Sequence, residues 1–180
     1  MASIVFITGG GRSGKSAFAQ SLAETIPEAR VYLATAPVLD KEMARRIARH
    51  QADRKTGGWK TAEETIDVAG VLMRIPDRAT VLVDCLTLWI NNLMYVAERQ
   101  GVDITEDHVV DVCRNVIATC GRREGTVIFI TNEVGMGIIP DNSSSRLFRD
   151  LAGRCNQIMA TAADTAIFMV SGLPLYLKGP

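Results

Sequence analysis

The chain has 180 residues, 47% of them hydrophobic, which is enough for a single globular domain covering residues 1–180. Lysine plus arginine equals aspartate plus glutamate at 20 each, so the formal net charge is zero and gives no electrostatic footprint for nucleic acid. No apolar run approaches the roughly 18 residues of a membrane span. The N-terminus also lacks a basic leader, and we therefore expect a cytoplasmic protein.

The four cysteines form no C-x-x-C pair and lie in apolar surroundings; they are Cys85, Cys113, Cys120 and Cys155. This pattern favours reduced thiols in the core over disulfides or zinc ligands. It agrees with a cytoplasmic location.

Short apolar runs alternate with helical segments along the chain. Strands are predicted at residues 4–7, 31–35, 80–84, 126–131 and 165–170, and a last strand at 174–178 could form an antiparallel edge. Helices are predicted at residues 16–26, 40–54, 62–73, 86–99, 105–120 and 144–162. This alternation predicts an α/β fold with a mostly parallel sheet flanked by helices on both faces. Together with a phosphate-binding motif at residues 9–16, it predicts a fold of the P-loop NTPase type. Ligands of such folds bind beyond the carboxyl ends of the strands.

The first predicted strand and helix enclose a G-x-x-x-x-G-K-S motif, the spacing of a phosphate-binding loop. Its residues are Gly9, Gly10, Gly11, Arg12, Ser13, Gly14, Lys15 and Ser16. Glycines let backbone N–H groups surround an anion, and the helix N-terminus adds partial positive charge. Lys15 would reach the β- and γ-phosphates, and the Ser16 hydroxyl would bind Mg²⁺. A glycine-rich turn that merely contains Lys-Ser is the alternative, but both flanking segments favour a nucleoside triphosphate site.

Asp84 closes the apolar run 81–84, where phosphate-loop proteins place the acidic residue that helps to hold Mg²⁺. A metal at Ser16 needs a carboxylate opposite it, which favours this role for Asp84. Capping of the following helix is the alternative.

His50 lies on a predicted helix whose stripe of residues 39, 43, 47, 50 and 54 begins apolar and ends polar. A helix face that changes in this way leaves the core for a cleft, where imidazole could act as acid, base or nucleophile. A buried histidine bonded to a backbone carbonyl is the alternative. Nearby arginines could bind polyphosphate or form a solvated face.

A long loop at residues 131–142 follows the fourth predicted strand and contains two glycines and a proline. It could form a wall or lid for a second substrate, a subunit interface, or a plain connection.

Several stretches together resemble one family, the bifunctional adenosylcobinamide kinase/adenosylcobinamide-phosphate guanylyltransferase of cobalamin biosynthesis. The most particular is Arg46-Ile47-Ala48-Arg49-His50 followed by Trp59-Lys60-Thr61-Ala62-Glu63-Glu64. The others are residues 9–16, 31–36, 83–89, 132–135, 146–150, 153 and 156–157. The similarity covers nearly the whole chain.

The resemblance implies two reactions that use Mg²⁺ and ATP or GTP. The γ-phosphoryl group first goes to the hydroxyl of adenosylcobinamide, a corrinoid; GMP then passes from GTP through a covalent histidine intermediate to the phosphorylated product. It implies that His50 is the guanylylated residue and that the enzyme is a homotrimer. It places nucleotide contacts at residues 9–16 and at Leu33, Ala34, Thr35, Gln51, Ala52, Asp53, Arg54, Glu63 and Asp84. Glu63 could accept hydrogen bonds from guanine.

Two other functions remain open from the residues alone. One is a P-loop kinase for another small molecule, without nucleotidyl transfer and with a structural His50. The other is a non-enzymatic nucleotide switch, against which stands the absence of an obvious second regulatory domain. Neither the kinase base nor the corrinoid contacts can be named from the sequence.

Overall fold

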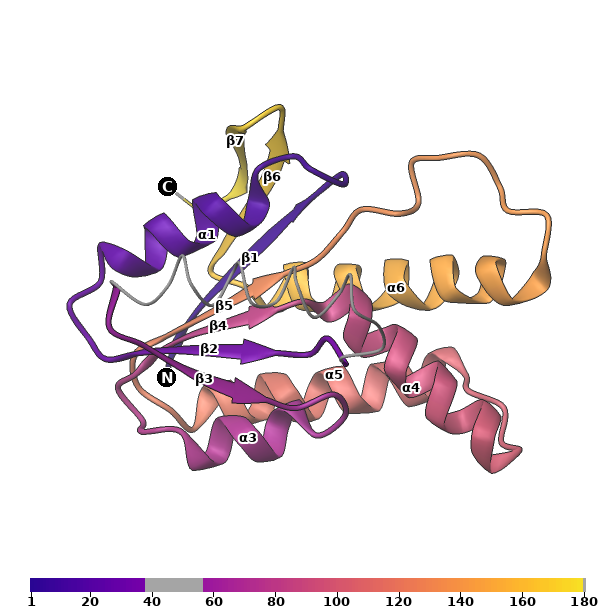
Figure 1. Cartoon of the computed structure of the whole chain (residues 1–180), viewed down its shortest axis with the longest axis horizontal. Coiled ribbons are helices and arrows are strands. Elements are labelled where there is room, and N and C mark those ends of the chain that lie inside the picture. The colour runs from indigo at the N-terminus through magenta and orange to yellow at the C-terminus, as the bar shows by residue number, and fades with distance from the viewer. Residues whose placement is uncertain (38–56, 180) are drawn as a thin grey trace.

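The computed structural model describes residues 1–37 and 57–179, and its centre is one seven-stranded sheet (Figure 1). The strand order is β3-β2-β4-β5-β1-β6-β7, and every neighbouring pair is parallel except β6 and β7. The strands are β1 (Ser3–Gly9), β2 (Arg30–Ala34), β3 (Trp59–Glu63), β4 (Thr80–Asp84), β5 (Thr126–Ile130), β6 (Thr165–Val170) and β7 (Leu173–Lys178). The predicted parallel sheet and its antiparallel edge are both confirmed.

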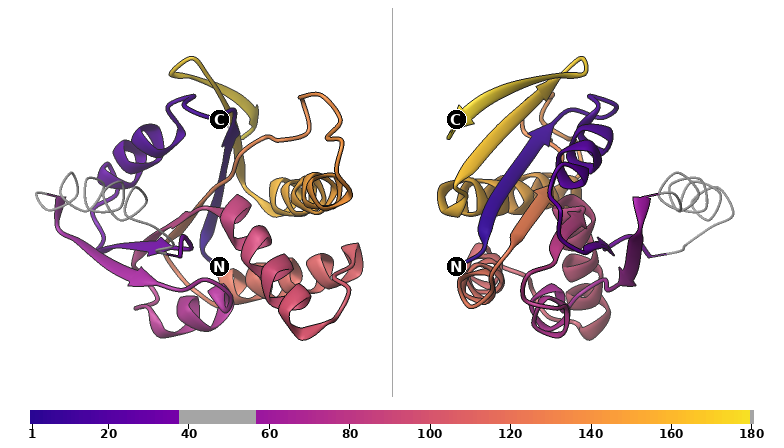
Figure 2. Two further views of the ribbon diagram at one scale, coloured as in Figure 1. Left: turned by 45° about the vertical axis from the view of Figure 1, so that its right-hand side comes forward. Right: turned by 90° about the vertical axis from the view of Figure 1, so that its left-hand side faces the viewer.

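Helices cover both faces of the sheet, as predicted (Figure 2). The described helices are α1 (Lys15–Glu24), α3 (Val68–Arg74), α4 (Leu86–Gln100), α5 (Glu106–Gly121) and α6 (Ser143–Ala162). Alternate residues of the central strands point to opposite faces, so Val81 and Val83 pack with α3 to α6 while Leu82 packs on the α1 side. Strands buried on both faces explain why the sequence reads as continuous apolar runs.

Local capping agrees with the predicted helix boundaries in several places. Thr105 accepts a hydrogen bond from the His108 backbone N–H and caps α5, which begins one residue after the predicted bound of 105. Asn142 does the same for Ser145 at the start of α6. Among the described residues, no helix is long and apolar enough to cross a membrane. All four cysteines are buried and free, as predicted.

The segment before α3 differs from the prediction. Residues 62–73 were expected to be helical, but residues 59–63 form the edge strand β3, and α3 begins only at Val68. Asp67 fixes that start because its carboxylate accepts a hydrogen bond from the Gly70 N–H at 2.8 Å. The predicted helix at 40–54 lies outside the described residues.

One buried arginine, just after α5, binds the end of α3. Arg123 is 3% exposed, and its guanidinium donates hydrogen bonds to the backbone carbonyls of Leu72, Ile75 and Pro76. These carbonyls lie at the end of α3, where no further helical turn can satisfy them. Arg123 therefore closes the connection between α3 and β4.

We predict that Arg123→Met lowers the free energy of unfolding by about 2–3 kcal/mol, because buried carbonyls lose their donor. Urea denaturation followed by circular dichroism measures the change. The control is Arg122→Met, at the neighbouring exposed position, where we expect a change within about 0.5 kcal/mol. Equal denaturation midpoints for the two variants would contradict this assignment.

Candidate active site

The G-x-x-x-x-G-K-S motif forms the turn between β1 and α1, where the strand-loop-helix order of the sequence predicted it. Gly14 is the N-cap of α1 with φ of 92°, a conformation that favours glycine. A Cβ atom on Gly14 would lie 3.2 Å from the Gly172 Cα. The Gly172 N–H donates to the Ser13 carbonyl at 3.0 Å, so the β6–β7 turn packs directly on the loop. This contact holds the phosphate-binding loop against the β6–β7 turn.

Lys15 lies inside the curl of the loop. It is 7% exposed, and its Nζ donates to the Gly10 carbonyl at 2.6 Å and to the Ser13 Oγ at 3.5 Å. Burial lowers the pKa of the Lys15 ammonium group, and the nearby Asp84 carboxylate opposes that shift. The positive charge is therefore held in place by the loop that would receive a triphosphate.

The predicted metal-binding pair, Ser16 and Asp84, is brought together at the carboxyl edge of the sheet. The Ser16 Oγ donates to the Asp84 Oδ2 at 3.2 Å. The Tyr32 Oη donates to the same oxygen at 2.9 Å. Tyr32 was not recognised as a site residue from the sequence, since it reads as an ordinary apolar residue of a strand.

The donor set at this point fits Mg²⁺, which prefers oxygen ligands and keeps several waters. It consists of the hydroxyl of Ser16 and the carboxylate of Asp84, with Lys15 beside them. Within residues 1–37 and 57–179, no group of three or more His, Cys, Asp or Glu residues could hold a metal alone. A magnesium ion here would therefore complete its shell with nucleotide phosphates and water.

The end of β2 meets the end of β4 through a buried hydrogen-bonded pair. The Thr35 Oγ1 accepts from the Cys85 N–H at 2.8 Å and donates to the Cys85 carbonyl at 2.7 Å. Burial raises the pKa of the Cys85 thiol to about 11, so it stays neutral at physiological pH beside Asp84. Leu33 and Thr35 are fully buried and Ala34 is partly exposed. Their predicted nucleotide contacts stay a prediction.

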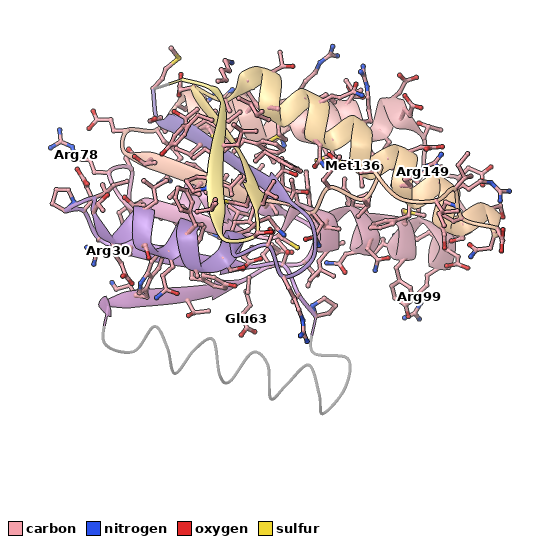
Figure 3. The ribbon with its side chains drawn as sticks, turned by 90° about the horizontal axis from the view of Figure 1, so that it is seen from above. Arg30, Glu63, Arg78, Arg99, Met136 and Arg149 are labelled. Atoms are coloured by element: carbon pink, nitrogen blue, oxygen red, sulfur yellow. The ribbon has the colours of Figure 1, made fainter. Side chains whose placement is uncertain are left out.

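Glu63 lies at the carboxyl end of β3, in register with Ala34 of β2. Its side chain is exposed and projects from the edge of the molecule in Figure 3. The other residues predicted to contact nucleotide, together with the predicted nucleophile, lie outside the described residues; they are His50, Gln51, Ala52, Asp53 and Arg54.

A second polar network holds the end of β5 and was missed by sequence reasoning. The Thr131 Oγ1 donates to the Asn156 Oδ1 at 2.8 Å and lies 3.2 Å from the Thr87 Oγ1. The Thr87 Oγ1 also accepts from the Asn132 N–H at 2.7 Å, and the Asn156 Nδ2 donates to the Asn132 carbonyl at 3.2 Å. In the sequence, only the position of Thr131 and Asn132 at the end of a predicted strand pointed to this network. The partners of these two residues, Thr87 on α4 and Asn156 on α6, lie far from them in the sequence.

Comparison with known families gives a match to "Cobinamide kinase / cobinamide phosphate guanyltransferase" over residues 5–177. The bifunctional adenosylcobalamin biosynthesis protein CobU of Salmonella typhimurium is 39% identical, with 97% of this chain and 99% of that protein covered. CobP of Pseudomonas aeruginosa is 38% identical, with 96% of each chain covered. CobU of Escherichia coli is 35% identical, with 97% and 99% covered.

Solved structures support the fold. An ATPase from the type III secretion system of pathogenic bacteria superposes with a TM-score of 0.57 at 12% identity. The ATP synthase subunit NeqB from Nanoarcheaum equitans gives 0.56 at 11% identity. The superposition with the secretion-system ATPase covers 97% of this chain and 56% of that chain. The superposition with NeqB covers 93% of this chain and 45% of that chain. At such identity, the likeness concerns the nucleotide-binding fold alone.

We predict that Tyr32→Phe weakens Mg²⁺-dependent nucleotide binding about tenfold, because one hydrogen bond to a charged group is lost. Titration of a fluorescent GTP analogue with and without Mg²⁺ measures the effect, and binding in excess chelator should change little. Tyr95→Phe is the control, since that ring is 57% exposed on α4. If Tyr32→Phe and Tyr95→Phe both bind the GTP analogue with the Mg²⁺ dependence of the wild type, the hydrogen bond from Tyr32 to Asp84 does not contribute to Mg²⁺ binding.

Proposed function

We infer that this chain, which belongs to the cobinamide kinase / cobinamide phosphate guanyltransferase family, is an enzyme of cobalamin biosynthesis. It carries out both reactions, the phosphoryl transfer and the guanylyl transfer. The observation that carries this conclusion is the family match over residues 5–177, with relatives similar along nearly their whole length. The phosphate-binding loop and the Ser16–Asp84 pair supply the nucleotide chemistry that both reactions need.

In the kinase reaction, a hydroxyl oxygen of cobinamide bonds to the γ-phosphorus, and the bond from that phosphorus to the β–γ bridging oxygen breaks. Lys15 lies where it can offset charge on the β- and γ-phosphates. Ser16 and Asp84 would hold Mg²⁺, which supplies charge stabilisation when bound. The hydroxyl proton is released, so the products are cobinamide phosphate, a nucleoside diphosphate and a proton.

In the guanylyltransferase reaction, we assign the nucleophile to His50 on the strength of the family motif. A neutral imidazole nitrogen bonds to the α-phosphorus of GTP, and pyrophosphate leaves. A phosphate oxygen of cobinamide phosphate then attacks the same phosphorus and releases the imidazole. Glu63, exposed at the end of β3, is a suitable acceptor for the guanine N1–H and amino group.

We predict that GTP labelled at the α-phosphorus leaves acid-labile, alkali-stable label on the wild-type protein and none on His50→Ala. The physical reason is the phosphorus–nitrogen bond of a phosphoramidate. The control is His108→Ala, which removes the other histidine of the chain, at an exposed position of α5. A wild type that transfers the γ-phosphoryl group but never takes up α-label would leave a P-loop kinase without nucleotidyl transfer.

We further propose a cytoplasmic homotrimer. Four free cysteines, including a Cys113–Cys155 pair with sulfurs 3.6 Å apart, suit a reducing compartment. The β6–β7 hairpin carries exposed apolar side chains, among them Leu173, Leu175 and Tyr176, which suit burial against another subunit.

We expect size-exclusion chromatography with light scattering to give three times the 19.6 kDa chain mass. Leu175→Glu should lower that mass, because a charge at a subunit contact is costly to bury. Lys178→Glu, an exposed change at the end of the same strand, serves as the control. A monomeric mass for the wild type would exclude the trimer.

A further inference from the structure

A cavity of about 730 Å³ lies on the α6 side of the sheet, apart from the Ser16–Asp84 pair. Its walls come from β1, the start of the 131–142 loop, α6 and the end of β7. Met136 of the loop and Arg149 of α6, both labelled in Figure 3, line the cavity. Its volume lies within the roughly 300–1,000 Å³ typical of small-molecule sites.

The inner end of this cavity adjoins the phosphate-binding loop. Thr8, which lines it, immediately precedes Gly9. Glu133 also lines it, and its backbone N–H donates to the Gly9 carbonyl at 3.1 Å. Because β5 lies between β1 and β4 in the parallel sheet, the residues after β5 leave the same edge of the sheet as the loop and Asp84. A molecule in this cavity would therefore lie next to the first residue of the phosphate-binding loop.

Two polar groups of the cavity wall have no hydrogen-bond partner. The Thr8 side chain is 6% exposed, and its Oγ1 is unpaired. The Arg154 Nε is buried and unpaired as well. Buried polar groups are almost always hydrogen-bonded, and leaving one unsatisfied carries a free-energy cost. Two such groups around one cavity point to a ligand that supplies an acceptor and further hydrogen bonds.

The ionisable groups of the wall nearly balance. Three carboxylates, Glu106, Glu133 and Asp150, face two guanidiniums, Arg149 and Arg154. Arg149 already donates to the Asp150 Oδ1 at 2.9 Å from Nη2 and 3.0 Å from Nε. This composition does not suit a second polyphosphate, which would require an excess of positive charge. It suits a ligand that carries little net charge and many neutral hydrogen-bonding groups.

Apolar side chains also line the cavity, namely Phe6, Met136, Ala160 and Leu177. A large ring system with carboxamide groups on its edge matches apolar surface combined with isolated polar groups. Cobinamide has this chemistry, because its macrocycle bears neutral amide side chains.

We propose that this cavity binds the corrinoid acceptor, with carboxamides satisfying Thr8 and Arg154 and the hydroxyl-bearing arm directed toward the phosphate-binding loop beside Glu133. This assignment rests on the proposed function and adds to it the location of the second substrate. Asn156 borders the same cavity and bonds to Thr131 and Asn132, so the network at the end of β5 also fixes the cavity wall.

The first test removes one hydroxyl. Thr8→Val keeps the shape of the side chain and loses no hydrogen bond in the free protein. We expect cobinamide affinity to fall about three- to tenfold, the range of one hydrogen bond, while GTP affinity is unchanged. Thr80→Val is the matched control because the Thr80 hydroxyl is also buried and unpaired. Thr80 is the first residue of β4, at the end of the strand away from Asp84 and the cavity. Visible absorption of the corrinoid in equilibrium dialysis measures the binding.

The second test fills the cavity. Gly153 lines it, and a Cβ atom built there meets no atom within 4 Å, so Gly153→Leu should fold and even favour the helix. We expect cobinamide affinity to fall at least about tenfold, with GTP affinity unchanged. Gly153→Ala, which adds a single methyl group, should stay near wild type. Light scattering on each variant shows whether subunit assembly has changed.

The outcomes separate this proposal from the proposed function. If the wild type phosphorylates cobinamide while Thr8→Val and Gly153→Leu bind it normally, the cavity assignment is wrong and the function stands. If Gly153→Leu lowers the assembled mass, the cavity is a subunit interface and the assignment is overturned. A wild type that neither binds nor phosphorylates cobinamide would contradict the proposed function itself.

Discussion

One carboxylate oxygen, the Asp84 Oδ2, joins three parts of the fold at the site. It accepts a hydrogen bond from Ser16 at the start of α1 and another from Tyr32 of β2, while Asp84 itself ends β4. The carboxyl ends of parallel strands meet at one edge of the sheet, so these groups converge without any long loop. The position of α1, and hence of the phosphate-binding loop, relative to the sheet depends on this junction.

The loop is also held from its other side. The Gly172 N–H of the β6–β7 turn donates to the Ser13 carbonyl, and the Gly172 Cα would lie 3.2 Å from a Cβ atom on Gly14. The end of β5 is fixed in turn by Thr131 and its partners on α4 and α6. Preorganised polar groups of this kind lose little conformational freedom when a triphosphate binds. The antiparallel hairpin thus contributes to the site as well as to the edge of the sheet.

The sequence was sufficient wherever local signals and burial agreed. The motif at residues 9–16, the apolar run ending at Asp84 and the Thr105 cap all specified their structures by neighbouring residues alone. The edge strand β3 was missed because it is polar and partly exposed, so it shows no apolar run. Its first residue is held by a contact across the fold, from the Trp59 Nε1 to the Glu24 Oε1 at 3.1 Å, which no local pattern encodes.

The cavity could not be found from the sequence for the same reason. Thr8 and Arg154 are ordinary residues of a strand and a helix, and only the packing of α6 beside β1 places both on one wall. The unpaired state of their polar atoms is a property of the folded chain. The family resemblance named the substrates but carried no residue for the corrinoid.

Two transfers to the same arm of one acceptor raise a geometric problem that the arrangement of the site helps to solve. The kinase reaction takes place at the γ-phosphorus and the second reaction at the α-phosphorus, two bridging oxygens further along the nucleotide. An arm that enters from the proposed cavity beside Gly9 would have to reach two different phosphorus atoms of a triphosphate held in one position. The proposed covalent transfer of GMP to His50 would remove that difficulty, because the α-phosphorus would leave the triphosphate before the acceptor attacks it. The proposed intermediate and the proposed cavity are therefore consistent with each other. If the acceptor stays in one cavity, the GMP group has to move between the two reactions.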